Sequence, residues 1–516
     1  MKGFTLVEMM VALLIFGLVA AAGVSILSFS LDNQQVVRAR SHRLGELQRA
    51  RSALKADLAQ AAARRTRDED GRPSSRNLAG GEQAVGGPLL QLVRRGWDNP
   101  DAAPRASLQA VEYRLADGRL ERRSRAALDG AAWRPPQVLL TGVREAHVAF
   151  RVGGQWLETL PNGTHQPLPQ GHAPRPDARR LWRGLAGLRG HGRGGVRRKD
   201  EQGVALLTVL LLMAVMATLA AGVLEEIRFA IRRAANAEAV GQARWYALGA
   251  EQLARAQIAR LAQAGVTAGG WSGRTVSFPV DGGVIQARID DGAACFNLNS
   301  VVEGAPEALR RNDEGVRQFV NLTVAVGLGR REGEMLAAAL VDWLDTDPLR
   351  EAGGAEDESY GGSDPAYLTG AAPLAEASEL RAIRGFTPEV YRRLRPFVCA
   401  LPTTALSPIN VNTLPEEKAV LITMLAETPP ATETLRRLIA ARPAAGWTIG
   451  DFVGLPVIQA AAFPQAATSQ LKDRSDWFRL ETEVTLGDAE AVTTSLLARD
   501  AAGRIRVVAR RWGPEE

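Results

Sequence analysis

The chain has 516 residues, of which 46% are hydrophobic and 23% charged, a balance that excludes a wholly disordered chain, a collagen and a small disulfide scaffold. The formal net charge is +6, but residues 162–200 alone contribute +7, from eight Arg and one Lys against two Asp. The rest of the chain therefore sums to −1, and the basic composition gives no argument for a nucleic-acid partner.

A membrane-spanning helix is the first expected element. Residues 9–31 are 23 residues without a charge, and about 20 apolar residues suffice to cross a bilayer as a helix. Alone, such a run also fits a secretory signal peptide or a simple anchor. It follows a short basic leader and a Gly-Phe pair, and Glu8 stands directly before it. A carboxylate costs about 2.5 kcal/mol or more in a lipid-embedded helix, so Glu8 needs a partner.

An amphipathic helix is expected over residues 32–64, because apolar residues recur there at helical spacing: Val36, Leu44, Leu47, Leu54 and Leu58. Alternation then predicts a hairpin, with strands at Val111–Leu115 and Gly118–Arg122 around an Asp-Gly turn. Further strands are predicted at 138–140, 143–152 and 155–157.

The next stretch, residues 162–195, is rich in Gly, Pro, His and Arg and shows weak periodicity. It has three interpretations: a linker that binds a metal or nucleic acid, a disordered linker, or a frameshift that fused two adjacent coding regions. We favour the frameshift, because the pattern of the first half then starts again.

A second basic leader ends at Gly203, and the 21 uncharged residues Val204–Leu224 form a second membrane-spanning run. An amphipathic helix is expected from Glu225 to Leu261, with an apolar face made of Ile227, Ala230, Ile231, Ala247, Leu248, Leu253 and Ile258. Basic leaders stay on the cytoplasmic side, so each leader faces inside and each globular body faces out. One uncut chain cannot place both leaders on the cytoplasmic side and both globular bodies on the other side.

The region after residue 265 combines strands with short helices. A hairpin is predicted around Asp281-Gly282-Gly283, helices at 313–344 and 374–397, and alternating strands at 478–486 and 504–511. The only two cysteines, Cys295 and Cys399, both lie here. An oxidising exported compartment favours a disulfide, for which the chain-entropy model gives roughly 4–5 kcal/mol as an upper guide for a loop of about 100 residues. The alternative is two buried free thiols.

An acidic loop is the sharpest chemical feature. From Asp342 to Asp364 there are eight acids, one base and four Gly. Calcium takes six to eight oxygen ligands from such flexible, carboxylate-rich loops, although the spacing is not that of an EF-hand. A solvated acidic loop is the plain alternative, and paired carboxylates for hydrolysis lack a nearby nucleophile or His. The candidate calcium ligands are Asp342, Asp345, Asp347, Glu356, Asp357 and Asp364.

Residues 409–417, which begin Ile-Asn-Val-Asn, resemble the opening of the helix-hairpin-helix repeat of DNA-uptake receptors. Such hairpins bind phosphate through the backbone amides of a Gly-rich turn. That turn is missing here, so a packing motif is the better interpretation.

The first leader, with Gly3, Phe4 and Glu8, resembles the signal of type IV pilins and pseudopilins. The resemblance implies that a prepilin peptidase cuts between Gly3 and Phe4 and methylates the new amino terminus. It also implies that Glu8 meets the amino terminus of a neighbouring subunit. The first body resembles the J-type minor pseudopilin of type II secretion systems.

The second leader implies a cut between Gly203 and Val204, which makes Thr208 the fifth mature residue. A missing fifth-position Glu is typical of the K-type minor pseudopilin, which sits at the tip with no neighbour above it. The Asp-Trp-x-Asp-x-Asp sequence from Asp342 and the Gly-Ala-Glu-Asp sequence from Gly354 also resemble that family, which implies structural calcium.

We therefore interpret the chain as a J-type and a K-type minor pseudopilin in one reading frame. The expected fold class is α+β: two pilin-like units, each a long N-terminal transmembrane helix on a small antiparallel sheet, the second with a large α-helical insertion at about 300–400. The expected parts are a leader (1–3), a span (4–31), a J-type body (32–161), a junction with the second leader (162–200), a second span (204–224) and a K-type body (225–516).

The resemblance implies a structural role rather than an enzyme. The proteins would form the tip of a periplasmic pseudopilus, anchored in the bacterial inner membrane by one span per unit. Expected partners are I-type and H-type minor pseudopilins, the major pseudopilin, the prepilin peptidase and the inner-membrane assembly platform, with no nucleic acid. The alternatives are minor pilins of a type IV pilus and a membrane-tethered DNA receptor, the latter distinguishable by salt-sensitive DNA binding.

Overall fold

The structure is a computed structural model, which describes residue 10 and residues 40–74, 76–81, 88–152, 155–158, 204–263 and 270–513. The chain divides into two compact units, each made of two separate stretches. The first unit comprises Met1–Leu168 with Asn297–Ala405, and the second comprises Pro169–Phe296 with Leu406–Glu516. Three names are used below: the N-terminal body (residues 40–158), the helical insertion (297–405) and the C-terminal body (204–296 with 406–513).

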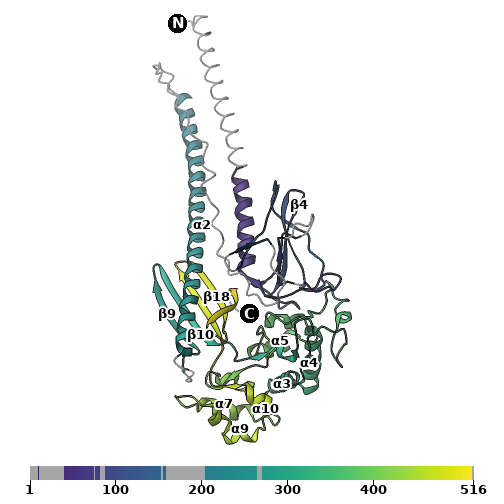
Figure 1. Ribbon diagram of the computed structural model, residues 1–516. Helices are drawn as coiled ribbons and strands as arrows, with labels where there is room; N and C mark the ends of the chain where they lie inside the picture. Colours follow the sequence, from purple (N-terminus) through teal and green to yellow (C-terminus); the bar gives the residue numbers. More distant parts are fainter. Residues whose placement is uncertain are drawn as a thin grey trace. The chain divides into compact units, whose positions relative to one another are not determined.

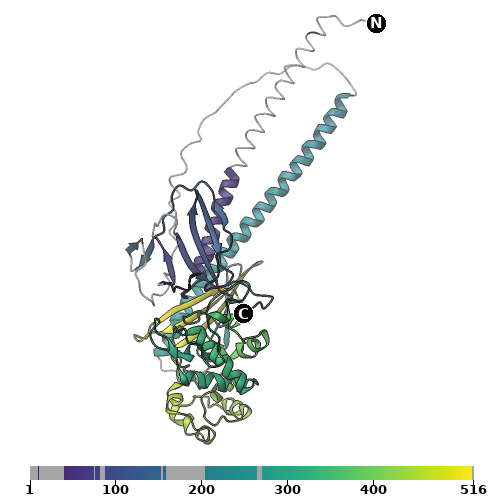
Figure 2. The same ribbon diagram turned by 90° about the vertical axis from the view of Figure 1, so that its right-hand side faces the viewer.

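The N-terminal body is a helix over residues 40–59 packed on an antiparallel sheet. The strand order is β1-β3-β4-β5-β6, with β2 also paired to β3. Figure 2 shows the helix in purple beside these strands. The strands are β1 (Ala61–Ala62), β2 (Leu78–Gly80), β3 (Leu90–Arg94), β4 (Gln109–Ala116), β5 (Arg119–Ser124) and β6 (Gln137–Leu140).

The predicted hairpin is confirmed, since β4 pairs with β5 and Leu115 lies opposite Leu120 across the Asp-Gly turn. A short separate hairpin, β7 (Phe150–Val152) with β8 (Gln155–Leu157), confirms the last predicted pair. The strand predicted over 143–152 is wrong for most of its length, because only its last three residues are extended and paired.

The buried face of the first helix differs from the apolar stripe in the sequence. Leu44, Leu47 and Leu58 are exposed, whereas Ala50 lies in the core beside Leu90, Leu92 and Val111. Asp57 is buried on the same face and accepts hydrogen bonds from Tyr113 Oη at 2.6 Å and Arg122 Nε at 2.6 Å. A carboxylate with these partners is held inside, so the face that meets the sheet is chosen by tertiary contacts.

The helical insertion packs α3 (Asp313–Ala325) against α4 (Arg330–Leu344). The Asn312 side chain caps α3 by accepting from the backbone N–H groups of Glu314 and Gly315. Short helices follow at η3 (Asp357–Ser359), η4 (Ala377–Ala382), α5 (Pro388–Leu394) and η5 (Arg395–Phe397). The predicted helices at 313–344 and 374–397 are thereby confirmed.

The C-terminal body places the long helix α2 (Val204–Gln263) on a five-stranded sheet of order β19-β18-β17-β10-β9 (Figure 1). The strands are β9 (Arg274–Val280), β10 (Gly283–Asp291), β17 (Trp477–Leu486), β18 (Ala489–Arg499) and β19 (Ile505–Trp512). The hairpin at Asp281-Gly282-Gly283 and the two tail strands are confirmed, while β18 lies between the tail strands where none was predicted.

A stripe of four alanines and one isoleucine on α2 meets this sheet. It consists of Ala243, Ala247, Ala250, Ala254 and Ile258, spaced three or four apart. This is the period that puts side chains on one face of a helix. Short side chains let the helix lie close to Val484 and Leu480 of β17. Ile227, Ile231 and Leu253, which the sequence pattern assigned to the apolar face, are exposed.

Five short helices occupy the rest of this body: α6 (Val420–Thr423), α7 (Thr432–Ala440), α8 (Ile449–Val453), α9 (Pro456–Ala460) and α10 (Gln465–Gln470). These helices belong to the second unit and lie outside the insertion, which ends at Ala405.

Within the described part of the chain, no helix combines the length and the apolar composition that crossing a membrane requires. The span predicted at Val204–Leu224 lies at the start of α2 and is not confirmed. Apart from Met10, the span predicted at 4–31 lies outside the described residues, as do Gly3, Phe4, Glu8 and Gly203.

Candidate functional site

The acidic loop begins where α4 ends. Asp342 lies in the last turn of α4, and Asp345 is the residue at which the helix stops. Both are buried, with exposed fractions of 1% and 5%. Asp342 Oδ1 accepts the backbone N–H of Glu351 at 2.9 Å, which folds the loop back on the helix. A Cβ at Gly354 would stand 2.0 Å from Asp342 Oδ2, so only glycine allows this approach.

Aromatic side chains support the other end of the loop. The ring of Trp343 meets Tyr360 edge-on at 5.3 Å, and Tyr360 packs against Tyr367 at 5.1 Å. Tyr360 Oη also accepts the backbone N–H of Arg384 at 3.2 Å. The loop is thus held in place at both ends.

Three carboxylate oxygens of the loop are buried without a hydrogen-bond partner: Asp342 Oδ2, Asp345 Oδ1 and Glu356 Oε1. Such groups are rare in folded proteins, and each costs about 1–3 kcal/mol. Burial, and then repulsion from Asp347, raises the pKa of Asp345 to about 8. Burial, and then repulsion from Asp342, raises the pKa of Glu356 to about 7. These two carboxyl groups therefore hold their protons more tightly than exposed carboxyl groups do.

Two predicted ligands lie apart from this group. Asp357 binds Arg67 through both oxygens, each at 2.8 Å, and accepts from the Thr369 hydroxyl at 2.8 Å. Although burial opposes it, the Arg67 hydrogen bond lowers the pKa of Asp357. Asp364 is exposed, and Asp347 is also exposed but close enough to raise the pKa of Asp345.

The predicted calcium ligands do not form a metal site in this structure. Among the residues that the structure describes, no group of three or more His, Cys, Asp or Glu side chains stands in a geometry that could hold a metal ion. What the structure does bring together is Asp342, Asp345 and Glu356, with their unpartnered oxygens.

The second site is a buried arginine that no sequence pattern indicated. Arg64 is completely buried. Its Nη2 donates to Asp129 Oδ2 at 2.8 Å in the N-terminal body, and its Nε donates to Glu379 Oε2 at 2.9 Å in the helical insertion. Burial alone would lower the pKa of Arg64, but the two carboxylates outweigh it and raise the pKa, so the guanidinium stays charged.

Both carboxylates that bind Arg64 also accept hydrogen bonds from backbone N–H groups of other residues. Glu379 Oε1 accepts the N–H groups of Ala375 at 2.7 Å and Glu376 at 3.3 Å, where the side chain closes a capping box at η4. Asp129 Oδ1 accepts the N–H of Arg67 at 2.9 Å. Each carboxylate is thus oriented by backbone N–H groups as well as by Arg64.

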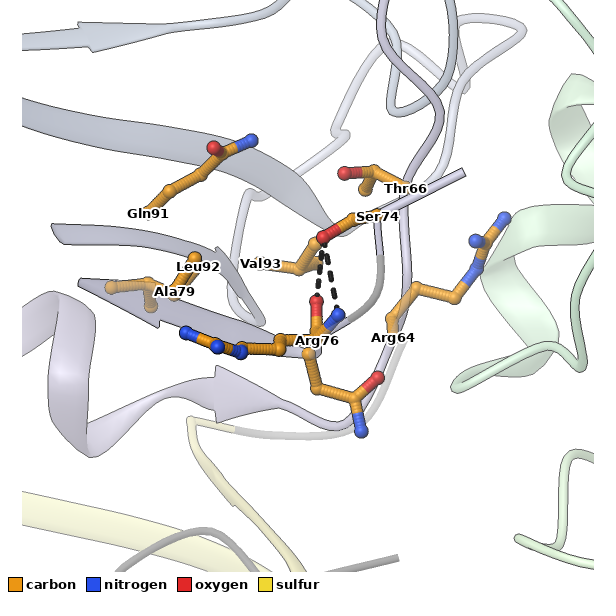
Figure 3. Close-up of a pocket in the computed structure, with 9 residues that line it drawn as sticks. Arg64, Thr66, Ser74, Arg76, Ala79, Gln91, Leu92 and Val93 are labelled. Atoms are coloured by element: carbon orange, nitrogen blue, oxygen red, sulfur yellow. Dashed lines mark hydrogen bonds between the residues drawn. The ribbon is translucent and has the colours of Figure 1, made fainter. Parts of the chain in front are cut away.

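A cavity of about 10 Å³ lies beside Arg64 in the N-terminal body (Figure 3). Thr66, Ser74, Arg76 and Gln91 contribute polar groups to its lining, and Ser74 Oγ donates to the carbonyl of Arg76 at 2.9 Å. This is the room of one water molecule, too little for an organic ligand.

The asparagines of the Ile-Asn-Val-Asn sequence, Asn410 and Asn412, form hydrogen bonds with other groups inside the protein. Asn412 donates to the carbonyl of Trp447 at 2.9 Å and accepts its N–H at 2.8 Å, and Asn410 Nδ2 donates to Ser475 Oγ. Asn299 likewise donates to the carbonyl of Leu374 at 3.0 Å and accepts its N–H at 2.8 Å. The predicted disulfide is confirmed, since Cys295 and Cys399 are both disulfide-bonded.

Helix-on-sheet packing and the amino-terminal sequence together define the class of protein. Mixed helices and antiparallel sheets occur in both bodies, and residues 1–24 match the model of the prokaryotic N-terminal methylation motif. The chain thus belongs to the proteins that carry a pilin-type signal.

The particular family follows from three further matches. Residues 25–172 match the model of type II secretion system protein J, and residues 294–403 and 409–472 match two models of protein K. The chain therefore belongs to the type II secretion system proteins, with protein J in its N-terminal part and protein K in its C-terminal part, and it is a minor pseudopilin of that system.

Individual relatives agree with this division. Protein K of Pectobacterium carotovorum subsp. carotovorum is 35% identical over 322 residues, which cover 61% of this chain and 98% of the relative. Protein J of Vibrio cholerae serotype O1 is 34% identical over 169 residues, which cover 30% of this chain and 73% of the relative. The crystal structure of the GspK-GspI-GspJ complex from enterotoxigenic Escherichia coli aligns at 26% identity and a TM-score of 0.47, covering 55% of this chain and all of that one.

Proposed function

We propose that this chain supplies the tip of a periplasmic pseudopilus, starts its assembly and aids protein export across the outer membrane, as a structural component and not as an enzyme. The observation that carries the proposal is the joint presence of protein J and protein K sequences, each behind its own leader. Thr208 in place of a fifth-position Glu supports a tip position, since a subunit at the tip has no neighbour above it.

The same proposal states how the chain is processed, where its products lie and with which proteins they assemble. A prepilin peptidase cuts after Gly3 and after Gly203, and methylates Phe4 and Val204. Each product is anchored in the inner membrane by its apolar helix, with its body in the periplasm. The assembly partners are I-type and H-type minor pseudopilins, the major pseudopilin and the assembly platform. A relative of this chain crystallised as a GspK-GspI-GspJ complex, which supports the choice of partners.

Intact-mass analysis of membranes from cells that express the native locus tests this proposal. Two chains, beginning at Phe4 and Val204 with methylated amino termini, are the expected result. A single chain near 55.3 kDa, cut only after Gly3, would contradict the second cut and leave a true fusion. A chain that keeps both leaders would contradict the whole proposal.

The acidic loop binds structural calcium in this proposal. The chemistry of the donors suits calcium, because Asp342, Asp345 and Glu356 offer unpartnered buried oxygens and calcium prefers oxygen ligands; in this structure these described side chains do not stand in an arrangement that could hold an ion. Bound calcium would neutralise the loop's charge and supply no chemistry beyond that. Calcium titration of the purified full chain by calorimetry tests it, with Asp345→Asn expected to lose binding and the exposed Asp364→Asn to keep it. Unchanged binding by Asp345→Asn would contradict the assignment.

The DNA-receptor alternative is not supported by the surroundings of Asn410 and Asn412. Both side chains are buried and bonded to protein groups, so they face no solvent from which a phosphate could approach. The minor-pilin alternative shares the signal and the helix, but the matches to proteins J and K of type II secretion favour the role proposed here.

A further inference from the structure

We propose that each of the two helix-on-sheet bodies contains one carboxylate clamp, which fixes the position of the helix along the sheet and passes axial force between them. This rests on the proposed function, in which the helix carries the membrane anchor and the rest of the body makes its contacts outside the membrane. Any force between anchor and body then crosses the interface between helix and sheet. The two clamps are Asp57 with Arg122 and Tyr113 in the N-terminal body, and Glu251 with Arg510 and Ser495 in the C-terminal body.

The clamp of the C-terminal body joins α2 to two strands. Glu251 on α2 is 1% exposed, so its carboxylate lies inside the interface. Arg510 of β19 binds both of its oxygens, with Nη2 at 2.6 Å from Oε1 and Nε at 2.9 Å from Oε2. Ser495 Oγ of β18 donates to Oε2 at 2.7 Å. The helix is thus bound to its sheet by a buried, two-pronged ion pair and one hydroxyl group.

The N-terminal body repeats this arrangement with different residues. Asp57, 2% exposed, accepts from Arg122 Nε at 2.6 Å and Nη2 at 3.1 Å, and from Tyr113 Oη at 2.6 Å. Burial lowers the pKa of Arg122, but the hydrogen bond and charge of Asp57 outweigh it and raise the pKa, so the guanidinium stays charged. Burial, and then the charge of Asp57, raises the pKa of Tyr113, so the phenol keeps the proton that it donates. Two unrelated sets of residues therefore build the same contact.

The apolar contacts of α2 resist separation from the sheet better than sliding along it. The helix meets the sheet through Ala243, Ala247, Ala250 and Ala254, whose side chains are single methyl groups. Hydrophobic attraction depends on buried area and has no preferred direction, so a shift that exchanges one alanine for another changes it little. Residues 224–238 of α2 are exposed, and the helix extends past the sheet (Figure 1). A polar contact is therefore needed to define where along the sheet the helix stands.

Only one axial position of α2 satisfies the clamp. A shift by one helical turn, about 5.4 Å, brings residue 247 or residue 255 to the place of Glu251. Ala247 offers no acceptor to Arg510. Arg255 would meet Arg510 as a like charge, and it would also leave the carbonyl of Ile505, which it now binds at 2.9 Å. Because a two-pronged ion pair has a fixed geometry and an unpaired buried charge is costly, the clamp opposes movement in both axial directions.

Pulling single molecules in two directions tests this inference on the detergent-solubilised full chain. Handles are attached through Ala234→Cys on the exposed part of α2 and Ala501→Cys in the exposed loop between β18 and β19, since the native cysteines are already disulfide-bonded. The loop lies next to Ile505, which packs with Ile258 near the end of α2, so this pair of handles loads the interface along the helix axis. A second pair, Ala256→Cys with Ala501→Cys, loads it across the axis, because Ala256 lies at the level of the loop.

The lifetime of the contact between helix and sheet at constant load is the quantity measured. Glu251→Ala is expected to shorten it about 100-fold under axial load and less than about tenfold under load across the axis. Arg510→Lys keeps the charge but loses the two-pronged geometry, and it is expected to shorten the axial lifetime about tenfold. This milder change serves where Glu251→Ala fails to fold. Glu238→Ala, at an exposed position of α2, is the control and should change neither lifetime.

Two results would overturn the inference for α2. Equal shortening in both directions would show that Glu251 contributes general stability and no axial hold, and an unchanged axial lifetime would show that other contacts carry the force. In the N-terminal body, Asp57→Ala with handles at Ser41→Cys and Asp101→Cys should repeat the axial effect, and its absence would overturn the clamp there. Two processed chains in cells combined with lifetimes that do not depend on direction would remove this inference alone and leave the proposed function standing.

Discussion

Replacing Asp345 by Asn should have opposite effects with and without calcium. Without the ion, Asp345 is a buried carboxylate with an unpartnered oxygen and acidic neighbours. Such an oxygen costs about 1–3 kcal/mol, and an amide removes the repulsion while keeping the shape. Asp345→Asn should therefore raise the free energy of unfolding of the calcium-free protein by about 1–3 kcal/mol.

With calcium the order should reverse. A ligand that binds only the folded state at 100 times its dissociation constant stabilises by about 2.7 kcal/mol, and the variant should lose this gain. Urea unfolding followed by tryptophan fluorescence, in chelator and in calcium, measures both values, because Trp343 lies beside the loop. Asp364→Asn, an exposed change on the same loop, serves as the control and should follow the wild type.

Two results would refute this reasoning. If Asp345→Asn destabilises the calcium-free protein, the unpartnered oxygen has a partner in solution and the loop carries no stored cost. If the variant still gains stability from calcium, the ion binds elsewhere.

Three further predictions concern stability. Glu251 on α2 accepts hydrogen bonds from Arg510 at 2.6 Å and from Ser495 at 2.7 Å, and so binds the helix to its sheet. Glu251→Ala should lower the free energy of unfolding by about 3 kcal/mol and speed amide hydrogen exchange in β18 more than 100-fold. The control Glu238→Ala, at an exposed position of α2, should change neither quantity. Burial raises the pKa of Asp291, so its ionised form is disfavoured in the folded state; the stability of wild type relative to Asp291→Asn should fall as pH rises above about 4, and a flat difference would contradict this. Cys399→Ser should cost about 2–4 kcal/mol in chemical unfolding, with equal loss on reduction of the wild type.

Local signals in the sequence predicted local structure well. Two turns were predicted from consecutive residues and are confirmed: the Asp-Gly turn between β4 and β5 and the turn between β9 and β10. The strand β18 was missed because its alternation uses Ala, Ser and Thr, which carry weak apolar contrast. Leu44 and Leu58 looked like core residues, yet the face that is buried follows Ala50, since contacts with the sheet decide it.

Of the two candidate sites, the sequence predicted the one whose residues are close in sequence and missed the one whose residues are far apart. Composition alone pointed to the acidic loop, because its carboxylates are close in sequence. It could not reveal that Asp357 is bound by Arg67, which stands 290 residues earlier. Arg64 gave no signal at all, since one arginine among many becomes distinctive only when Asp129 and Glu379 are brought to it.

The composition of the first unit has a consequence for the timing of folding. Arg64 is synthesised 315 residues before Glu379. At roughly 5–20 residues per second, about 15–60 s pass between the two on the ribosome. During that time Arg64 and the apolar residues around it lack the cover that the insertion provides. Completion of this core is therefore a late event of synthesis, and an N-terminal chain made separately would have to wait in the same way for its partner.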